Sequence, residues 1–306
     1  MKVYVHPLLN EREREYFITH SATELAFTFN DGTCTLKHCR DADIAIGNFN
    51  TSWIEEMTNL KAILLDSVGT DNFNGYQWSK GNTVMVCNLA DFFTIPVAEE
   101  VLASLLSVYR LHSELYGAQQ NNCWAKDTIR FKKRLLSDAS VLIIGFGNIG
   151  RRIASLLAPF GCEVQTFDNQ DMEVGGIAAL TSAVSLNDVI ISTIPATTET
   201  LDIFDEKMFA AMRSGATFLN VGRGQVVDEV ALCQKAKNDK TFSACLDVTV
   251  QEPIPDNSLL WKLPNIYLTQ HTGGGSIDEN YKKIDIYISQ IHRLLNDQPL
   301  NNMIQF

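Results

Sequence analysis

The feature that most constrains the fold of this chain is a glycine-rich turn that joins a strand to a helix. The run Val141–Ile144 is uninterrupted and apolar, as expected of a central parallel strand buried on both faces. It leads into Gly-Phe-Gly-Asn-Ile-Gly at 145–150, after which apolar residues recur at helical spacing. Because G-x-G-x-x-G stands here between a strand and a helix, it predicts a dinucleotide-binding βαβ unit.

Each glycine of this motif has a separate physical role. Gly145 permits a tight turn, Gly147 lets the backbone approach a pyrophosphate, and Gly150 lets the helix pack on the strand. The phosphate charge would then lie at the helix N-terminus, which favours anions. The alternative is a glycine-rich turn without a ligand, and the flanking strand and helix favour the dinucleotide over it.

A carboxylate after the next strand indicates which dinucleotide is bound. Asp168 ends the run Val164-Gln165-Thr166-Phe167-Asp168, 18 residues past Gly150. A carboxylate at this place can accept hydrogen bonds from the ribose hydroxyls, and it repels a 2′-phosphate. Between Ile153 and Glu206 there is no Lys or Arg that could hold such a phosphate. The sequence therefore predicts NAD(H) rather than NADP(H).

Composition excludes several classes of protein. Of the 306 residues 45% are apolar, so the chain can bury cores and is not expected to be disordered. Its 36 acidic and 25 basic residues give a net charge of −11, which argues against nucleic acid because phosphates require clustered Lys and Arg. No apolar run reaches the roughly 18 residues of a membrane span, and no signal-peptide region is present. We therefore expect a cytoplasmic protein.

The cysteines do not indicate a disulfide framework or a metal centre. There are seven of them, without a C-x-x-C pair, and we interpret them as reduced, mostly buried thiols. Cys34, His38 and Cys39 lie close together in the sequence and could form part of a metal site. Because no distant second pair of ligands accompanies them, we expect no metal.

Short apolar runs alternate with helical patterns along the chain, which is typical of α/β proteins. At this length two domains are expected. A helix from Val97 to about Leu115 is expected to bridge the first strand series to the second. The strands expected around it are Lys2–His6, Ile44–Ile46, Ala62–Asp66 and Thr83–Cys87, then Val189–Ile194, Thr217–Val221, Ser243–Val248 and Ile266–Thr269; helices are expected at Lys207–Met212, Asp228–Lys237 and Glu279–Leu295.

Three ionisable residues stand at or near the expected carboxyl ends of strands, where ligands bind in such sheets. Arg223 lies between two glycines and can present its planar fork to a carboxylate. His271 is a proton donor suited to neutral pH, and a carboxylate such as Glu252 can stabilise its protonated form. Taken singly, each residue could be an ordinary surface or packed side chain. Together they suit hydride transfer to a 2-keto acid.

The order of motifs in the sequence resembles that of the D-isomer-specific 2-hydroxyacid dehydrogenase family over nearly the whole chain. The matching motifs are Val68-Gly69-Thr70-Asp71-Asn72, Val97-Ala98-Glu99, the glycine motif at 145–150, Ile194-Pro195-Ala196-Thr197-Thr198-Glu199-Thr200, Asn220-Val221-Gly222-Arg223-Gly224, Val227-Asp228-Glu229, Leu246-Asp247-Val248, Glu252-Pro253, Leu260-Trp261, Pro264-Asn265 and His271.

The resemblance implies a fold of two Rossmann-like doubly wound domains with parallel sheets. A coenzyme domain, expected at 97–277, would be inserted into a flavodoxin-like substrate domain formed by 1–96 and 278–306. Members of the family are typically homodimers joined through the coenzyme domain, so a homodimer is expected here.

The resemblance also implies roles for individual residues. Arg223 would bind the substrate carboxylate and polarise the keto group, His271 would give or take the proton, and Glu252 would pair with His271. The backbone amides of Val68 and Gly69 would bind the substrate carboxylate as well. The expected cofactor site comprises Gly145, Gly147, Asn148, Ile149, Gly150, Asp168, Ile194, Pro195, Thr200, Val221, Gly222, Arg223, His271 and Asp247, the last holding the nicotinamide carboxamide.

The implied activity is the NAD(H)-dependent interconversion of a small 2-keto acid and its D-2-hydroxy acid. Gly47-Asn48 lack the arginine of phosphoglycerate-specific relatives, which favours a non-phosphorylated substrate such as glyoxylate or hydroxypyruvate. Glu252 stands where formate dehydrogenases carry glutamine, which argues against formate. The alternative is an NAD(H)-responsive, co-repressor-like binding protein, since the same fold serves that role in relatives.

Several residues depart from the family pattern. Gln270 stands where a proline usually precedes the catalytic histidine, which predicts a less rigid strand exit. Thr249 replaces a usual aromatic residue, and Gly273-Gly274-Gly275 lacks the common variation among small residues. Both departures alter the pocket in a direction that the sequence does not give. Phe92 and Phe93 could line an apolar pocket, although core packing is the favoured interpretation.

Overall fold

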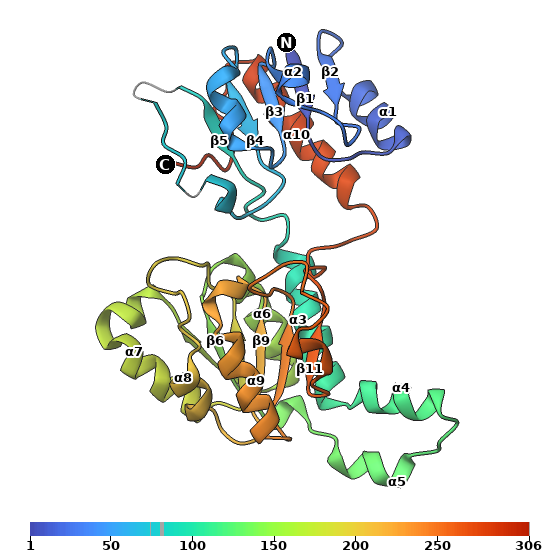
Figure 1. Ribbon diagram of the computed structural model, residues 1–306, viewed down its shortest axis with the longest axis vertical. Coiled ribbons are helices and arrows are strands. Elements are labelled where there is room, and N and C mark those ends of the chain that lie inside the picture. The colour runs from blue at the N-terminus through green and yellow to red at the C-terminus, as the bar shows by residue number, and fades with distance from the viewer. Residues whose placement is uncertain (74, 80–82, 306) are drawn as a thin grey trace. The chain divides into compact units, whose positions relative to one another are not determined.

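The computed structural model describes residues 1–73, 75–79 and 83–305, and it divides into two compact units. Unit 1 comprises Met1–Phe93 and Ser276–Phe306, and unit 2 comprises Thr94–Gly275. Each unit contains one parallel sheet flanked by helices (Figure 1). The doubly wound α/β fold predicted from the sequence is therefore confirmed.

Unit 1 is built on a five-stranded parallel sheet in the order β2-β1-β3-β4-β5, which is the flavodoxin-like order. The strand at one edge, β2, was not predicted. Its residues alternate between exposed and half-buried positions, so it lacks a continuous apolar run. The strands are β1 Lys2–Val5, β2 Ala26–Phe29, β3 Ile44–Ile46, β4 Ala62–Leu64 and β5 Met85–Cys87.

The helices of unit 1 include one from each end of the chain. Asn10 caps the N-terminus of α1 (Glu11–His20), since its side chain accepts from the amide of Glu13 and the Glu13 carboxylate accepts from the amide of Asn10. The C-terminal α10 (Glu279–Leu295), found where it was predicted, packs with α1. The other helical segments are α2 Leu36–Cys39 and the 3₁₀ turns Thr51–Glu56 and Asp71–Phe73.

Unit 2 is built on a six-stranded parallel sheet in the order β11-β10-β9-β8-β6-β7. The run Val141–Ile144 lies in β6 and is buried, as predicted for a central strand. Because the chain passes from β7 on one side of β6 to β8 on the other, the switch point lies between β6 and β8. The strands are β6 Ser140–Ile144, β7 Glu163–Phe167, β8 Val189–Ser192, β9 Thr217–Asn220, β10 Ser243–Leu246 and β11 Ile266–Leu268.

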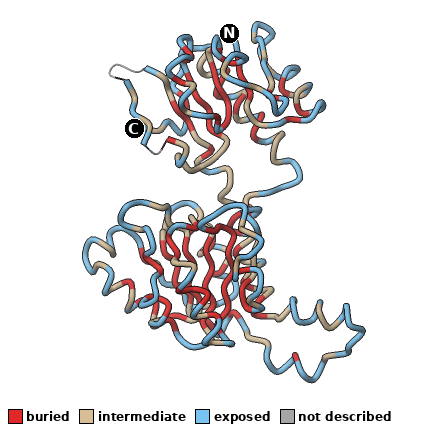
Figure 2. The backbone as a smooth tube through the Cα atoms, in the orientation of Figure 1, coloured by how far each residue is buried: buried red, intermediate tan, exposed pale blue. Residues whose placement is uncertain are grey.

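Helices cover both faces of this sheet, and successive residues of β6 contact different layers. Val141 and Ile143 belong to the core formed with α3 and α6, whereas Leu142 and Ile144 belong to the core formed with α7, α8 and α9. Buried residues accordingly concentrate along the strands (Figure 2). The helices are α3 Thr94–Tyr109, α6 Asn148–Leu157, α7 Asn169–Leu186, α8 Glu206–Ala211 and α9 Glu229–Asn238, with 3₁₀ turns at Ala158–Phe160, Gly224–Val226 and Leu259–Lys262.

The single helix predicted from Val97 to about Leu115 is wrong. Helix α3 ends at Tyr109, and α4 (His112–Gln120) begins after Leu111, which has a left-handed φ of 55°. Helix α4 starts an extended arm of unit 2 (Figure 1). The arm also contains α5 Lys126–Ile129 and the 3₁₀ turn Arg130–Lys132, and a further 3₁₀ turn, Leu136–Asp138, precedes β6.

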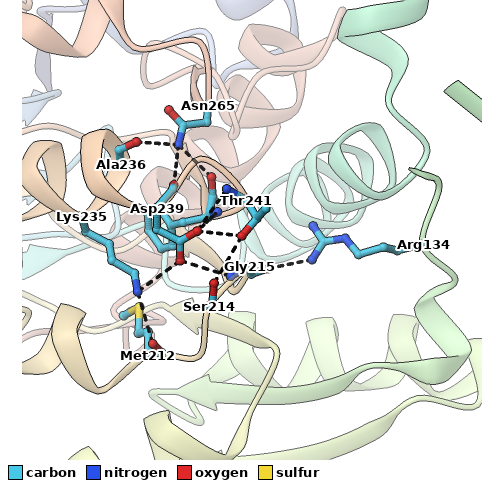
Figure 3. A network of polar contacts seen from close by, with 10 residues as sticks. Arg134, Met212, Ser214, Gly215, Lys235, Ala236, Asp239, Thr241 and Asn265 are labelled. Atoms are coloured by element: carbon cyan, nitrogen blue, oxygen red, sulfur yellow. Dashed lines mark hydrogen bonds and ion pairs between the residues drawn. The ribbon is translucent and has the colours of Figure 1, made fainter. Parts of the chain in front are cut away.

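A network of polar contacts joins several loops of unit 2 (Figure 3). Asp239 accepts hydrogen bonds from the amides of Gly215, Thr241 and Phe242, and it pairs with Lys235 at 3.4 Å. Burial alone would raise the pKa of Asp239, but these hydrogen bonds and that of the Thr241 hydroxyl lower it well below its ordinary value. The network ties together loops that are distant in sequence.

Among the helices in the described ranges, none has the length and apolar character needed to cross a membrane.

Candidate active site

The ionisable residues predicted to form a site lie beyond the carboxyl ends of neighbouring strands of unit 2. Arg223 follows β9, Asp247 follows β10, and His271 follows β11. Glu252 lies in the loop that Asp247 begins. Parallel strands present their carboxyl ends at one edge of a sheet, so the topology carries all four residues to the same edge.

His271 and Glu252 are in direct contact. Nδ1 of His271 lies 2.6 Å from Oε2 of Glu252. The second carboxylate oxygen, Oε1, accepts a hydrogen bond of 2.9 Å from the amide of Thr249. Both side chains remain partly exposed, at 56% for His271 and 37% for Glu252. With Nδ1 held by the carboxylate, Nε2 is the ring nitrogen left for a substrate, and it makes no hydrogen bond in the part of the chain that the structure describes.

The turn that carries His271 is tightly held. Gln270 and His271 both have left-handed backbone angles, with φ of 55° and 56°. The amide of His271 donates to the carbonyl oxygen of Asp247 at 2.6 Å. Oδ1 of the buried Asp247 accepts from the Thr269 hydroxyl and from the amides of Thr272 and Gly273.

The absence of proline at position 270 has a consequence for the backbone angle of the turn. Proline fixes φ near −65° and cannot adopt the angle found at Gln270. The departure from the family pattern therefore permits a sharp turn, and Asp247 fixes that turn. Asp247, predicted to hold a cofactor group, also positions the backbone of His271.

Arg223 lies on a turn that Asn220 organises. The fully buried Asn220 donates through Nδ2 to the carbonyl oxygen of Arg223 at 2.9 Å, and its Oδ1 accepts from the amide of Gly222. A side chain at Gly224 would collide with the backbone of Thr249, so this glycine allows close packing of the turn against the loop that carries Glu252.

Sequence reasoning gave no role to Asn220 or to Glu229. Oε1 of Glu229, the first residue of α9, accepts from the amide of Val250 at 2.7 Å and so holds the loop before Glu252. Burial raises the pKa of Glu229, the hydrogen bond from Val250 opposes this shift, and the charge of Glu252 adds to it. The sequence signals were an asparagine at a strand end and an acid at the start of a helix.

The glycine motif forms a cradle that fits a dinucleotide. Gly145 has φ of 91°, and a Cβ at Gly150 would collide with the carbonyl oxygen of Gly145. Around Gly147 there is open space, and no side chain caps the N-terminus of α6 at this residue. The first residues of α6 are Asn148 and Ile149, and a helix N-terminus preceded by glycine is a place where a pyrophosphate can bind.

Asp168 is the N-cap of α7. Its Oδ1 accepts from the amides of Gln170 and Asp171, at 2.9 and 3.4 Å, and Oδ2 of Asp171 accepts from the amide of Asp168. The hydrogen bonds to the cap use one oxygen of Asp168, so the other can accept from a ribose hydroxyl. Asp171 places a second carboxylate at the same helix end.

The remaining predicted cofactor residues lie after β8 and β9. Thr200 closes the loop after β8, because its hydroxyl donates to the carbonyl oxygen of Pro195 at 2.7 Å and accepts from the amide of Thr197. A side chain at Gly222 would collide with the backbone of Ile194, so the ends of β8 and β9 are in close contact there. Val221 directly follows β9.

In unit 1, Val68 and Gly69 lie on a loop whose carbonyl groups are engaged. The carbonyl oxygen of Val68 accepts from Nδ2 of Asn88 at 2.7 Å, and that of Gly69 accepts from the hydroxyl of Ser67 at 2.6 Å. The amides of Val68 and Gly69 donate to no group within the described ranges. The loop therefore presents two amide donors that a carboxylate can use.

Phe92 and Phe93 contact each other edge to face, with centroids 4.9 Å apart. Both are partly buried and pack against the core of unit 1 that contains Leu89 and Tyr287. This packing agrees with the interpretation that they are core residues.

The cysteines are free thiols, and Cys123 is the exposed one among them. His38 is used locally, because its Nδ1 accepts from the amide of Thr35 at 3.1 Å. Within residues 1–73, 75–79 and 83–305, no group of three His, Cys, Asp or Glu side chains is arranged to hold a metal ion.

Comparison with known proteins shows that this chain is similar to a set of dehydrogenases. The family model described as D-isomer specific 2-hydroxyacid dehydrogenase, NAD binding domain, matches residues 102–273. The D-3-phosphoglycerate dehydrogenase of Methanocaldococcus jannaschii is 28% identical over 280 residues, which are 88% of this chain and 53% of that protein. This chain therefore spans about half the length of that relative.

A second relative is covered more fully. The glyoxylate/hydroxypyruvate reductase B of Citrobacter koseri is 30% identical over 241 residues, which are 76% of this chain and 74% of that protein. Among solved structures, a D-isomer specific 2-hydroxyacid dehydrogenase family protein from Aeromonas salmonicida superposes with a TM-score of 0.85 at 23% identity, covering 99% of this chain and 98% of that one. The last comparison shows a shared fold.

Proposed function

The chain belongs to the D-isomer-specific 2-hydroxyacid dehydrogenases, a family of NAD-binding oxidoreductases, and we propose that it interconverts a small, non-phosphorylated 2-keto acid and the corresponding D-2-hydroxy acid. Glyoxylate, hydroxypyruvate and other non-phosphorylated 2-keto acids are the candidates. The observation that carries the proposal is the His271–Glu252 pair, which lies at the same sheet edge as Arg223.

Three residues of unit 2, His271, Glu252 and Arg223, have separate roles in the proposed reaction. The glycine motif at 145–150 and Asp168 would hold NADH, which would supply the hydride for the keto carbon. His271 donates the proton from Nε2 to the keto oxygen, and Glu252 stabilises the imidazolium before the transfer. Arg223 binds the carboxylate of the keto acid and stabilises the negative charge that develops on the keto oxygen. In the oxidation direction, His271 accepts the proton from the hydroxyl group.

Unit 1 contributes donors for an anionic group. We assign the amides of Val68 and Gly69 to binding of a carboxylate, because the carbonyl groups of this loop are engaged elsewhere. These amides are neutral donors, which matters in a chain whose net charge of −11 repels anions.

The proposal of a non-phosphorylated substrate rests on the surroundings of Asn48. Oδ1 of Asn48 accepts from the amide of Asp66 at 3.2 Å. The carboxylate of Asp66 in turn binds Lys283 and the hydroxyl of Tyr287. A phosphate near Asn48 would thus lie close to a carboxylate, and Lys283, which contacts this carboxylate, is already paired with Asp66 and Glu279.

The proposed preference for NAD(H) rests on two acids at the N-terminus of α7. Asp168 and Asp171 both lie where the adenosine ribose is expected, and each participates in the capping box. A 2′-phosphate would lie between these carboxylates without a cation, since no Lys or Arg occurs between Ile153 and Glu206.

We also propose that the protein is a homodimer and that the arm of unit 2 contacts the second copy. Trp124 and Phe131 on this arm are 90% and 79% exposed, which is unusual for large aromatic side chains. The same arm carries Lys126, Arg130 and Lys133 beside a hollow of about 670 Å³. Its basic residues complement the net charge of −11 of the chain, which suits a second copy of this chain. Trp124→Glu should convert a dimer to a monomer in light scattering.

The experiment that tests the activity is NADH oxidation by the purified protein with a panel of 2-keto acids. We expect turnover with at least one non-phosphorylated member of the panel. His271→Ala should abolish turnover while the protein still quenches or shifts NADH fluorescence on binding. A folded, NADH-binding wild-type protein that turns over no member of the panel would contradict the proposal.

A further inference from the structure

A cavity of about 450 Å³ lies beside the His271–Glu252 pair, and all of its lining residues belong to unit 2. His271 and Glu252 themselves form part of its wall, together with Thr249 and Gln270. Its volume is within the range of about 300 to 1,000 Å³ that is usual for sites of small molecules. The roles given to Asp247, Glu252 and His271 place no part of the substrate in this cavity.

The wall of the cavity is mostly apolar. Leu246, Pro253, Ile254 and Trp261 contribute hydrocarbon and aromatic surface. The polar atom of Trp261 is already used, because Nε1 donates to the carbonyl oxygen of Pro255 at 3.1 Å. The hydroxyl of Thr249 likewise donates to the carbonyl oxygen of Gln251 at 3.0 Å. The cavity therefore suits an uncharged, apolar group.

The charges around the cavity support the same conclusion. The acidic residues in its wall are Asp247 and Glu252, and no Lys or Arg is among the described residues that line it. An anionic group inside the cavity would lie close to these two carboxylates, and His271 in the same wall is already paired with Glu252. A second carboxylate or a phosphate is therefore disfavoured there.

Two of the departures from the family pattern occur at this cavity. Thr249 is smaller than the aromatic residue that usually stands at its position, so it leaves space between its loop and Trp261. Gln270, with its left-handed φ, forms another part of the wall. The sequence did not indicate how these residues change the pocket, and the structure shows that they border one open space.

We propose that this cavity is the subsite for the side chain of the 2-keto acid, and that the preferred substrates carry a branched aliphatic or aromatic side chain. This inference rests on the proposed function, because it places the keto oxygen at Nε2 of His271. The group attached to the keto carbon then lies next to the cavity that His271 borders. 4-Methyl-2-oxopentanoate and phenylpyruvate represent the expected class, and glyoxylate has no side chain to fill the space.

The first test compares substrates with the wild-type protein. One methylene in a hydrophobic pocket discriminates substrates by about 10- to 200-fold. We therefore expect kcat/KM for 4-methyl-2-oxopentanoate to exceed that for pyruvate by at least about 10²-fold, and that for glyoxylate by more. Equal or higher kcat/KM for glyoxylate and pyruvate would overturn the subsite. This comparison needs no variant.

The second test fills the cavity. Thr249→Phe should lower kcat/KM for 4-methyl-2-oxopentanoate at least about tenfold more than it lowers kcat/KM for pyruvate. Val250→Phe is the matched control, because it adds the same ring one residue away, at a partly exposed position that is not in the cavity wall. It should leave the ratio between the two substrates unchanged.

The outcomes separate this inference from the proposed function. If no 2-keto acid is reduced, the proposed function fails and the subsite fails with it. If pyruvate is reduced well and Thr249→Phe lowers both rates equally, the subsite alone is wrong. If Thr249→Phe does not fold, the substrate series of the wild-type protein decides the question.

Discussion

His271 Nδ1 and Glu252 Oε2 are 2.6 Å apart, and the other oxygen of Glu252 is fixed by the amide of Thr249. A carboxylate held at both oxygens orients the imidazole and fixes which ring nitrogen can face a substrate. The arrangement therefore leaves Nε2 of His271 to exchange a proton with the keto oxygen.

The pairing predicts a large effect of Glu252→Gln. The amide has nearly the same size but cannot stabilise the imidazolium. We expect kcat for keto-acid reduction to fall by about 10²-fold or more, with the affinity for NADH little changed. Steady-state kinetics and NADH fluorescence titration measure the two quantities. A variant with wild-type kcat would show that Glu252 does not assist His271.

Arg223 is expected to act through the geometry of its guanidinium group as well as through its charge. Arg223→Lys keeps the charge but loses the planar pair of donors, so kcat/KM for the keto acid should fall by about 10²-fold. Arg223→Ala should lower kcat/KM for the keto acid further than Arg223→Lys does. The comparison of the two variants at saturating NADH gives the measurement. Full activity of the lysine variant would contradict bidentate binding.

Asp168 is expected to set the preference for NADH. Asp168→Asn retains an N-cap for α7 and removes the charge, so the ratio of kcat/KM for NADH to that for NADPH should fall about tenfold or more, since juxtaposed like charges cost several kcal/mol. Glu173→Gln removes an exposed charge from the same helix and serves as the control. A lower KM for NADPH than for NADH in the wild-type protein would contradict the assignment.

The left-handed angle at Gln270 predicts that the residue common in relatives is harmful here. Gln270→Pro should lower the free energy of unfolding by about 1–3 kcal/mol, because proline cannot adopt φ of 55° and strain of this kind costs that amount. Gln270→Gly should be tolerated, since glycine adopts this angle without strain. Urea denaturation of both variants gives the measurement, and equal stability of the proline variant and the wild type would show that the turn is not constrained.

The hydrogen bonds to Asp239 predict a pH-dependent contribution to stability. The pKa of Asp239 is lower in the folded protein than its ordinary value of 3.8, so its contribution is present above that pH and is lost as the pH falls below it. Asp239→Asn should lower the free energy of unfolding by about 1.5–3 kcal/mol at pH 7. The difference from the wild type should shrink as the pH is lowered from about 5 to 3. A difference that is constant with pH would contradict the role of the charge.

The parts of the fold that were predictable are those in which the physical signal is local. The uninterrupted apolar run Val141–Ile144 indicates that β6 is buried on both faces, and the glycine motif follows this strand directly. Strand β2 gave no such signal, because it is an edge strand with exposed residues. The break at Leu111 was not predictable either, since the pattern of apolar residues continues across it.

The candidate site shows the same division between local and distant causes. The positions of Arg223 and His271 followed from the rule that ligands lie at the carboxyl ends of parallel strands. The supporting contacts of Asn220 and Glu229 join segments that only the folded chain brings together. The direction in which Thr249 changes the pocket depends on the cavity beside Trp261, which no sequence pattern describes.

The most direct test of the account is to follow the transferred hydrogen. The wild-type protein is supplied with NADH that carries deuterium in place of both hydrogens at C4 of the nicotinamide, and with the 2-keto acid, other than glyoxylate, that it reduces fastest. We expect the deuterium to appear at C2 of the product, and the product to be the D-2-hydroxy acid. Formation of the L isomer, or NADH oxidation without label at C2, would contradict it.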